Sequence, residues 1–350
     1  MSDGCDVNLQ DIEVIYSEPN GAVAWAQRRS EAEAPDVWPY GLNRLTDHFD
    51  SVRPVDLRRL APHDLLSLFL RRCRPTLPAT CVSLAWDERA AMRMVHRGTA
   101  ERMFSGIIWA TDAAVRGEDR FRTALSKRCL SRLDGIWCLS RAQLGPTSDW
   151  LGIDSSRIHY LRFGVDCDFF SYVAYPKGRP TIVSFGNDRD RDSKTLLSAL
   201  DLIISRNPEV RAIVQTDSDL PLPNGVIKID RVAHRQVHQI YGESSLVLVA
   251  TKNNLHASGM TVALEAMSTG RPVVVTGTPG MQDYVKDGVS GFLAEEGEPE
   301  SLASAALKII DSPRVGEVMG LAGRRAVEAS FNTTMMARRI AAIVSDVKRH

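Results

Sequence analysis

The sequence predicts an α/β protein built on two doubly wound parallel sheets. The chain has 350 residues, which is long for one ordinary domain and suits two. Its second half alternates short apolar runs with segments whose apolar residues recur at helical spacing. This rhythm is typical of a parallel sheet, because each connection between parallel strands crosses the sheet as a helix. The first half alternates in the same way, less regularly.

The expected elements follow from this alternation. In the second half we expect strands at 180–185, 210–215, 226–229, 246–250 and 272–276, and helices at 195–206, 234–241, 260–268, 299–310 and 314–329. In the first half we expect strands at 12–16, 79–84, 106–110 and 135–140, and helices at 64–72, 89–95 and 121–133. The segment 171–179 has no periodicity and is the expected linker, so we predict domains at 1–172 and 173–332. A last helix within 333–350 could pack back on the first domain.

Composition excludes several classes of protein. The 43 basic and 43 acidic side chains cancel, which argues against a nucleic-acid partner. The six cysteines show no zinc or redox spacing, so we expect reduced thiols and no metal site. The acidic start of the chain lacks the apolar core of a secretory signal, and no apolar run is long enough to cross a bilayer. We therefore expect a cytoplasmic protein. No motif indicates an oligomeric state.

The most informative stretch is 258–276. An apolar strand is followed by a loop and then by Ser258-Gly259, which opens a helix with Met260 and Thr261. A helix start after a parallel strand offers free backbone N–H groups and a positive dipole end, and a glycine allows close approach, so we predict a phosphate-binding site. Glu265, two turns into this helix, could accept hydrogen bonds from a ribose diol. The alternative is a helix-opening glycine with a solvated glutamate.

A second cluster follows the first strand of the same half. Gly186 allows a tight turn, and Arg189, Arg191 and Lys194 place cations beside it. A diphosphate held without a metal needs such charge. Because ligands bind at the carboxyl ends of strands in doubly wound sheets, both clusters are expected at one edge. The alternative is a solvated loop in which three intervening aspartates neutralise the arginines.

Three further groups are candidates. His256, beside the predicted phosphate site, could touch the donor sugar or phosphate, and Thr278 and Gly280 could offer polar groups to a sugar. In the first half, Trp86 and Trp109 lie next to acidic residues at strand ends, a pairing that suits a sugar; Asp87, Glu88 and Asp112 are therefore acceptor-site candidates. The alternative is that the tryptophans belong to the core and the acids cap helices.

The segment 56–74 is basic and partly amphipathic. It could lie weakly on an anionic membrane at the inner face, although a core-packed helix with arginines at its ends is the commoner arrangement.

Together these stretches resemble the retaining GT-B glycosyltransferases of family 4, also described as glycosyl transferases group 1. The likeness is strongest at 259–291, where Leu-Glu-Ala-Met-Ser-Thr-Gly-Arg-Pro-Val-Val, Thr-Pro-Gly and Asp-Gly-Val-Ser-Gly-Phe-Leu follow the family order. The segment 158–170, with Gly-Val-Asp and paired phenylalanines, resembles the end of the family's first domain. The likeness covers 134–350 well and the first 130 residues loosely.

The resemblance implies two Rossmann-like domains facing each other across a cleft, with a UDP- or GDP-linked sugar donor in the second and a small-molecule, glycan or lipid-linked acceptor in the first. It implies transfer with retention and without metal or cofactor. Glu265 would bind the ribose, while Arg189, Arg191 or Lys194 would bind the diphosphate. With these we group Asp112, Arg191 and His256 as the catalytic candidates.

Two positions depart from the family pattern. Ala257 stands where the family usually has a first glutamate that contacts the donor sugar, and Asn187 stands where an arginine often follows the turn glycine. Two other functions also stay open, the second of them because of Ala257. One is an NDP-sugar epimerase or hydrolase on the same scaffold, and the other is a binding protein that has lost turnover.

Overall fold

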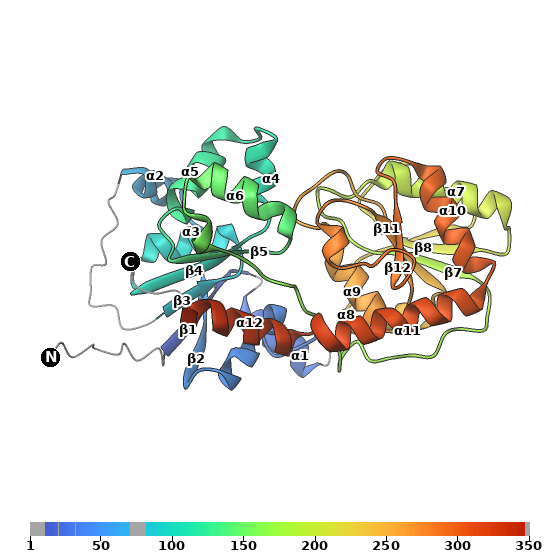
Figure 1. Ribbon diagram of the computed structural model, residues 1–350, viewed down its shortest axis with the longest axis horizontal. Helices are drawn as coiled ribbons and strands as arrows, with labels where there is room; N and C mark the ends of the chain where they lie inside the picture. The colour runs from blue at the N-terminus through green and yellow to red at the C-terminus, as the bar shows by residue number, and fades with distance from the viewer. Residues whose placement is uncertain (1–10, 20, 32, 71–81, 347–350) are drawn as a thin grey trace.

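The structure, a computed structural model, describes residues 11–19, 21–31, 33–70 and 82–346. Two domains lie side by side, each built on a six-stranded parallel sheet covered by helices, as Figure 1 shows. The predicted α/β fold class is confirmed. Within the described ranges, no helix has both the length and the apolar character needed to cross a membrane.

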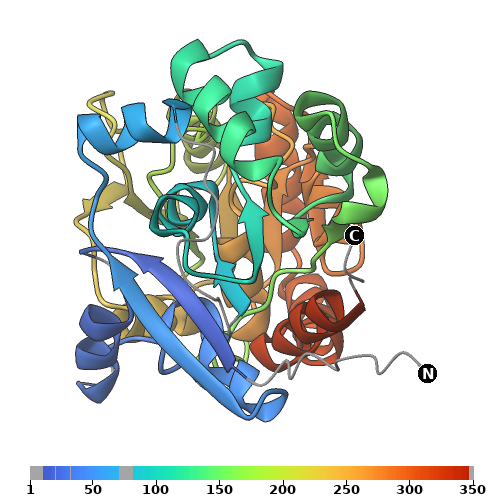
Figure 2. The same ribbon diagram turned by 90° about the vertical axis from the view of Figure 1, so that its left-hand side faces the viewer.

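The first sheet has the strand order β2-β1-β3-β4-β5-β6. Its strands are β1 (Asp11–Ser17), β2 (Ser51–Leu57), β3 (Val82–Ala85), β4 (Arg102–Ile107), β5 (Gly135–Cys138) and β6 (Ile158–Tyr160). Its helices are α1 (Ala22–Ser30), α2 (Pro62–Leu70), α3 (Glu88–Arg97), α4 (Ala110–Val115), α5 (Arg120–Leu130) and α6 (Leu144–Leu151). Helices α2, α4 and α5 lie on one side of this sheet (Figures 1 and 2).

The second sheet has the order β12-β11-β10-β7-β8-β9. Its strands are β7 (Thr181–Ser184), β8 (Arg211–Gln215), β9 (Val226–Ile229), β10 (Leu246–Val249), β11 (Val273–Thr276) and β12 (Gly291–Ala294). Its helices are α7 (Ser193–Arg206), α8 (His234–Glu243), α9 (Met260–Ser268), α10 (Pro299–Ile310) and α11 (Pro313–Ser330). The strand order reverses between β7 and β10, which makes this the crevice where ligands bind in doubly wound sheets.

Three strands were not anticipated from the sequence, and one was placed too late. β2 and β6 are edge strands, and β2 carries Pro54 and is largely exposed, so neither has a clear apolar run. β12 is a four-residue edge strand. β4 begins at Arg102 rather than at 106, because the fold buries the polar residues Arg102 and Ser105 that interrupt its apolar pattern.

The chain crosses between the domains twice, and the two crossings are hydrogen-bonded. The backbone N–H of Val165 donates to the Phe331 oxygen at 2.9 Å, and that of Thr333 donates to the Val165 oxygen at 3.2 Å. Helix α12 (Thr333–Asp346) then packs against the 3-10 helix Pro39–Asp47 of the first domain, on the side of the sheet opposite α4 and α5 (Figure 2). The expected return of the last helix to the first domain is thus present.

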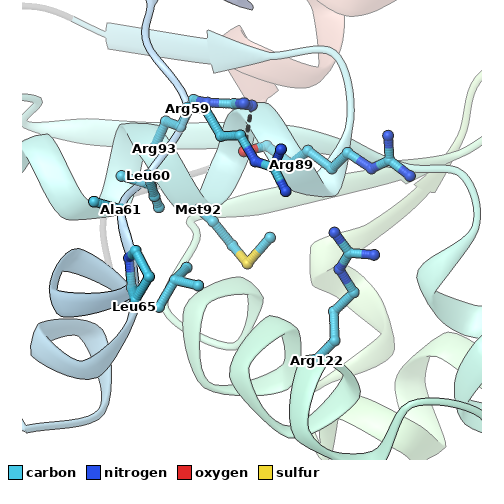
Figure 3. A pocket seen from close by; sticks show the side chains of 9 residues that line it. Arg59, Leu60, Ala61, Leu65, Arg89, Met92, Arg93 and Arg122 are labelled. Atoms are coloured by element: carbon cyan, nitrogen blue, oxygen red, sulfur yellow. Dashed lines mark hydrogen bonds between the residues drawn. The ribbon is translucent and has the colours of Figure 1, made fainter.

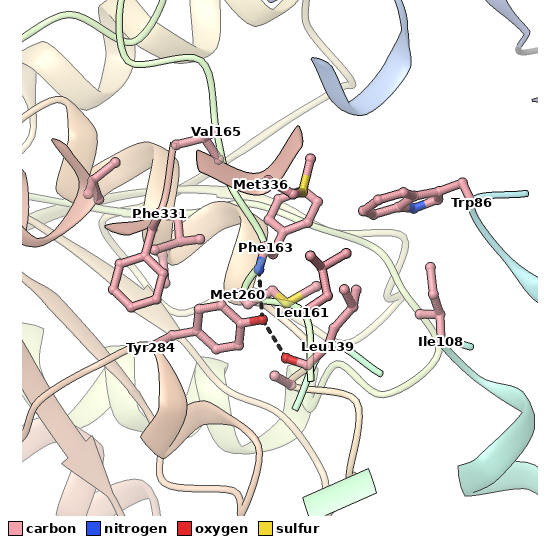
Figure 4. Close-up of a cluster of buried hydrophobic side chains, with 14 of the residues drawn as sticks. Trp86, Ile108, Leu139, Leu161, Phe163, Val165, Met260, Tyr284, Phe331 and Met336 are labelled. Carbon is pink, nitrogen blue, oxygen red and sulfur yellow. Dashed lines mark hydrogen bonds between the residues drawn. The ribbon is translucent and has the colours of Figure 1, made fainter. Parts of the chain in front are cut away.

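One apolar cluster runs from the first domain into the second (Figure 4). Tyr284, from the second domain, lies in it with its hydroxyl between two backbone groups of the first domain. The hydroxyl donates to the Leu139 oxygen and accepts from the Phe163 N–H at 3.2 Å. A buried tyrosine satisfied in this way fixes the separation of the two domains on one side of the cleft.

Helix α11 packs closely against the backbone that follows α9. A Cβ atom at Gly320 in α11 would collide with the backbone oxygen of Gly270, which follows α9. We expect Gly320→Ala to lower the free energy of unfolding by about 1–3 kcal/mol, because backbone cannot move aside as a flexible side chain can.

Gly145→Ala, in α6, is the control for Gly320→Ala, because a Cβ there meets nothing within 4 Å. We expect this change to be neutral or to stabilise the protein by up to about 1 kcal/mol. Urea denaturation measures both variants, and equal stability of the two would contradict the close approach of α11 to Gly270.

Candidate functional site

A cavity of about 300 Å³ lies between the two domains at the reversal of the second sheet. The second domain lines it with residues from the turns after β7 and β10, and the first domain lines it mainly with aromatic and aliphatic side chains. Seven of the residues proposed from the sequence line it: Gly186, Arg191, His256, Ser258, Gly259, Met260 and Thr261. The predicted placement of both clusters at one sheet edge is therefore observed.

The two glycines allow the turns to approach each other. Gly186 has φ +109° and Gly259, the N-cap of α9, has φ +88°, a region that side chains disfavour. The guanidinium of Arg191 fills the space that side chains would take. A Cβ atom at Gly186 would collide with Nη2, and one at Gly259 would lie 2.9 Å from Nη1.

Arg191 is held in this position by Asp188. Its Nε donates to Oδ2 of Asp188 at 2.7 Å, while Ser258 donates its hydroxyl to the other carboxylate oxygen, also at 2.7 Å. Burial raises the pKa of Asp188, but the charge of Arg191 and the Ser258 hydrogen bond outweigh it and lower the pKa below its ordinary value. An ionised Asp188 thus orients the guanidinium through Nε and leaves both Nη atoms on the side of the two glycines.

Glu265 lies behind this arrangement rather than in the cavity lining. Its side chain is buried, and Tyr241 donates a hydrogen bond to Oε2 at 3.2 Å. Burial raises the pKa of Glu265 to about 8, against the smaller opposing effects of the Tyr241 hydrogen bond and the Arg191 charge. The alternative of a solvated glutamate does not hold, because α9 is buried on the side that carries this residue.

His256 is the centre of a buried cluster that joins the domains. Its Nδ1 lies 2.8 Å from Oδ2 of Asp112 in the first domain, and its Nε2 lies 3.7 Å from Oδ2 of Asp190. The other oxygen of Asp112 accepts the backbone N–H of Leu255 at 2.8 Å. His256 lines the cavity, whereas Asp112 does not, so Asp112 positions the loop before α9.

The backbone next to this histidine is strained. Ala257 has φ +56°, a conformation that costs energy in a residue with a side chain. Ala257 is buried and contributes to the cavity lining. The departure from the family pattern at this position thus falls within the cavity.

The other two predicted cations lie elsewhere. Arg189 crosses to the first domain, where it lies 3.3 Å from Glu118 and donates to the Trp109 backbone oxygen at 3.3 Å. Lys194 is exposed in the first turn of α7 and does not line the cavity. Asp190 pairs at 2.8 Å with Arg116 of the first domain, a contact that sequence reasoning missed.

The first domain lines the cavity with an aromatic wall, which consists of Tyr40, Trp86 and Phe163. Tyr40 stacks on Trp86 with ring centroids 4.4 Å apart, and Phe163 lies 5.8 Å from Trp86. Tyr40, with φ +62°, and Phe163 were not proposed from the sequence. The Trp-Pro-Tyr-Gly turn at 38–41 was the sequence feature that could have pointed to Tyr40. Trp109 also lines the cavity.

The remaining acidic candidates accept hydrogen bonds from backbone N–H groups, and the other two candidates lie apart from them. Asp87 caps α3 by accepting from the backbone of Arg89 and Ala90, and Glu88 accepts the N–H groups of Ile108 and Trp109 at 3.0 and 3.1 Å. Gly280 lies against the Leu255 oxygen, while Thr278 is buried outside the cavity lining. Of the segment 56–74, the structure describes the end of β2 and α2, and residues 71–74 lie outside the described ranges.

Comparison with known proteins agrees with this geometry. Residues 179–312 match the family model described as glycosyl transferases group 1. A D-inositol 3-phosphate glycosyltransferase of Streptomyces griseus is 32% identical over 144 residues, which are 36% of this chain and 30% of that protein. Its namesake from Thermobifida fusca is 26% identical over 239 residues, which are 60% of this chain and 52% of that protein. The matches thus span about half or less of these relatives.

Solved structures extend the likeness of fold to the whole chain. Sucrose-phosphate synthase from Thermosynechococcus elongatus superposes with a TM-score of 0.70 at 14% identity, covering 96% of this chain and 98% of that one. HepE from Anabaena, in complex with UDP-glucose, gives a TM-score of 0.69 at 16% identity, with coverages of 96% and 99%. The chain thus has the fold of the GT-B glycosyltransferases, and its residues 179–312 are similar to the glycosyl transferases group 1 family.

Proposed function

We propose that this protein is a glycosyltransferase that moves a sugar from a UDP- or GDP-linked donor to an acceptor hydroxyl, with retention and without a metal. The observation that carries the proposal is the Arg191 guanidinium, held between two glycine turns and facing a cavity that both domains line. HepE, whose fold is similar, is in complex with UDP-glucose. The match of residues 179–312 to the glycosyl transferases group 1 model supports glycosyl transfer.

The diphosphate of the donor would lie between Arg191 and the start of α9. The αL conformation of Gly259 brings the first turn of α9 to the cavity, and Thr261 in that turn lines it. Backbone N–H groups and the positive end of the helix dipole stabilise a phosphate there. Arg191 adds a full charge and two Nη donors, which is the role a metal ion takes in other phosphate sites. Arg189 and Lys194 could approach the nucleotide only after a rearrangement of their present surroundings.

Glu265 would receive the ribose of the donor. A carboxyl group raised to a pKa of about 8 is largely protonated near neutral pH, so it can both donate to and accept from a diol. The side chains of Tyr241, which donates to Glu265, and of the nearby Arg191 would move when the nucleotide binds. His256, which lines the cavity beside Ala257, would contact the donor sugar where the usual glutamate is missing.

The acceptor would approach across the aromatic wall of Tyr40, Trp86 and Phe163. In the transfer step the bond from the sugar C1 to the β-phosphate oxygen breaks, and the acceptor oxygen bonds to C1 on the same face. The acceptor proton passes to the departing phosphate oxygen. Arg191 and the α9 amides stabilise the charge that develops on the diphosphate. The buried links between the domains exclude water from this step.

The alanine at position 257, where the family usually has a glutamate, favours a second candidate function. This candidate is a protein that binds the donor without turnover. The two candidates and the epimerase or hydrolase alternative separate in one experiment. The protein is incubated with UDP-glucose, UDP-N-acetylglucosamine or GDP-mannose, with and without a panel of acceptors, and in the presence of EDTA. We expect acceptor-dependent release of nucleoside diphosphate, unaffected by EDTA, and a product whose anomeric configuration matches the donor by NMR.

Conversion of the donor without any acceptor would instead indicate an epimerase or hydrolase. Donor binding by calorimetry without any product would indicate a binding protein.

Arg191→Ala tests the diphosphate assignment. Charge-assisted hydrogen bonds contribute about 1.5–3 kcal/mol, so we expect the Kd for UDP or GDP to rise about 10- to 100-fold. Isothermal titration calorimetry measures it. Arg206→Ala is the matched control, because Arg206 is an exposed arginine of the same domain that pairs with Glu300 outside the cavity. Unchanged affinity in Arg191→Ala would remove the proposed site.

Glu265→Gln tests the environment of the buried carboxyl. The group has a folded-state pKa of about 8 against an ordinary value of 4.5, so the folded protein binds its proton more tightly than the unfolded chain. Its contribution to stability is therefore fully present below pH 4.5 and is lost as the pH rises towards 8.

We expect wild type to lose about 3–5 kcal/mol relative to Glu265→Gln between pH 5 and pH 9, from denaturation at each pH. Glu317→Gln, at an exposed glutamate of the same domain, should follow the wild-type profile. Parallel profiles for wild type and Glu265→Gln would show that burial does not raise this pKa.

A further inference from the structure

A second and larger hollow, of about 810 Å³, lies in the first domain. Four arginines surround it, Arg59, Arg89, Arg93 and Arg122, and we call it the arginine hollow. Figure 3 shows their side chains around Met92, with Arg122 reaching in from the side opposite Arg59 and Arg93. The rest of its lining is apolar: Leu60, Ala61, Pro62, Leu65 and Met92.

The arginine hollow gathers four guanidinium groups that form no ion pair with a described carboxylate. Among the described residues, no carboxylate lies within 4.0 Å of these four guanidinium groups, although the whole protein has a net charge of +0. Arg93 instead donates to the hydroxyl of Ser17, to the backbone oxygen of Arg58 at 2.9 Å and to that of Arg89 at 3.3 Å. Burial is the main cause of the lowered pKa of Arg93; Arg89 and Arg59 lower this pKa further, whereas the charges of Asp87 and Glu18 act against the shift. Gathered guanidinium groups repel one another unless an anion joins them.

The arginine hollow continues towards the interdomain cavity. A smaller hollow of about 190 Å³ shares Arg89, Met92 and Arg122 with it, and shares Trp109 with the cavity. The guanidinium of Arg89 lies 5.2 Å from the centre of the Trp109 ring. Glu88 holds the backbone of Trp109 in place. The arginine hollow, the smaller hollow and the interdomain cavity therefore adjoin one another in this order, with Arg89 and Trp109 at the junctions.

We propose that the arginine hollow binds a phosphate or diphosphate group carried by the acceptor, while the acceptor hydroxyl reaches the interdomain cavity past Trp109. This inference rests on the proposed glycosyl transfer. Arginine suits the task because its planar guanidinium binds phosphate oxygens in pairs. The apolar lining accepts the part of the acceptor beyond the phosphate, which is a sugar in a soluble sugar phosphate or a hydrocarbon in a lipid-linked one.

The test removes positive charge from the arginine hollow in a protein whose donor site has already been weakened, so that ligand binding at the donor site contributes little to the measurement. In an Arg191→Ala background, Arg59 and Arg122 are both changed to Gln, and binding of inorganic pyrophosphate is measured by calorimetry. We expect the Kd to rise about tenfold or more, in line with the loss of two charged contacts. Arg120→Gln in the same background is the control, because Arg120 is exposed in the same turn of α5 and does not line the hollow.

UDP binding separates this inference from the proposed function. The Arg59→Gln/Arg122→Gln protein with Arg191 intact should bind UDP as wild type does. Absence of UDP binding by wild type would count against the proposed function alone. Equal pyrophosphate binding by the Arg59→Gln/Arg122→Gln and Arg120→Gln proteins, both in the Arg191→Ala background, would overturn the arginine hollow as a phosphate site.

Two further probes distinguish the source of the phosphate. Arginine-dependent binding of glucose 6-phosphate in solution supports a soluble acceptor. Arginine-dependent sedimentation with phosphatidylcholine vesicles that contain a polyprenyl diphosphate supports a lipid-linked one. Equal arginine-dependent sedimentation with phosphatidylglycerol vesicles that lack the diphosphate would overturn the proposal, because it would show a general membrane surface.

Discussion

The fit of one guanidinium between two glycines is the constraint on which the site depends. Gly186 follows strand β7 and Gly259 opens helix α9, and each adopts a positive φ that leaves space for Arg191. A side chain at either position would displace the guanidinium from the start of α9. The site thus depends on the absence of side chains at these two glycines as well as on Arg191, and the hydrogen bond to Asp188 orients the guanidinium.

The first domain determines where the loop before α9 lies. Asp112 holds Leu255 and His256, while Ser140 donates its hydroxyl to the Leu255 backbone oxygen. Arg116 pairs with Asp190 across the same gap. These contacts are buried or half-buried, so each charge has a partner where it is removed from water. The donor side of the cavity is therefore shaped partly by the domain proposed to hold the acceptor.

Electrostatic balance over the whole chain conceals strong local separation of charge. The carboxylates near the interdomain cavity are paired with arginines and a histidine, whereas the four arginines of the hollow have no such partners among the described residues. The zero net charge argues against binding of a long polyanion. It contains no information about a phosphate-sized site, because such a site needs only a few charges in one place.

The sequence by itself determined the two-sheet architecture, because buried parallel strands must be apolar and the helices between them must be amphipathic. It also located the two glycine turns of the second domain that we propose bind phosphate, since the residues of each turn are contiguous in the chain. Only the tertiary structure decided which cationic side chain lies at those turns. The sequence does not distinguish between Arg189, Arg191 and Lys194. In the structure, Arg191 lies against the glycines, Arg189 pairs with Glu118 and Lys194 is exposed to solvent. The aromatic wall, the role of Asp112 and the arginine hollow were likewise decided by folding, because each joins residues that are distant along the chain.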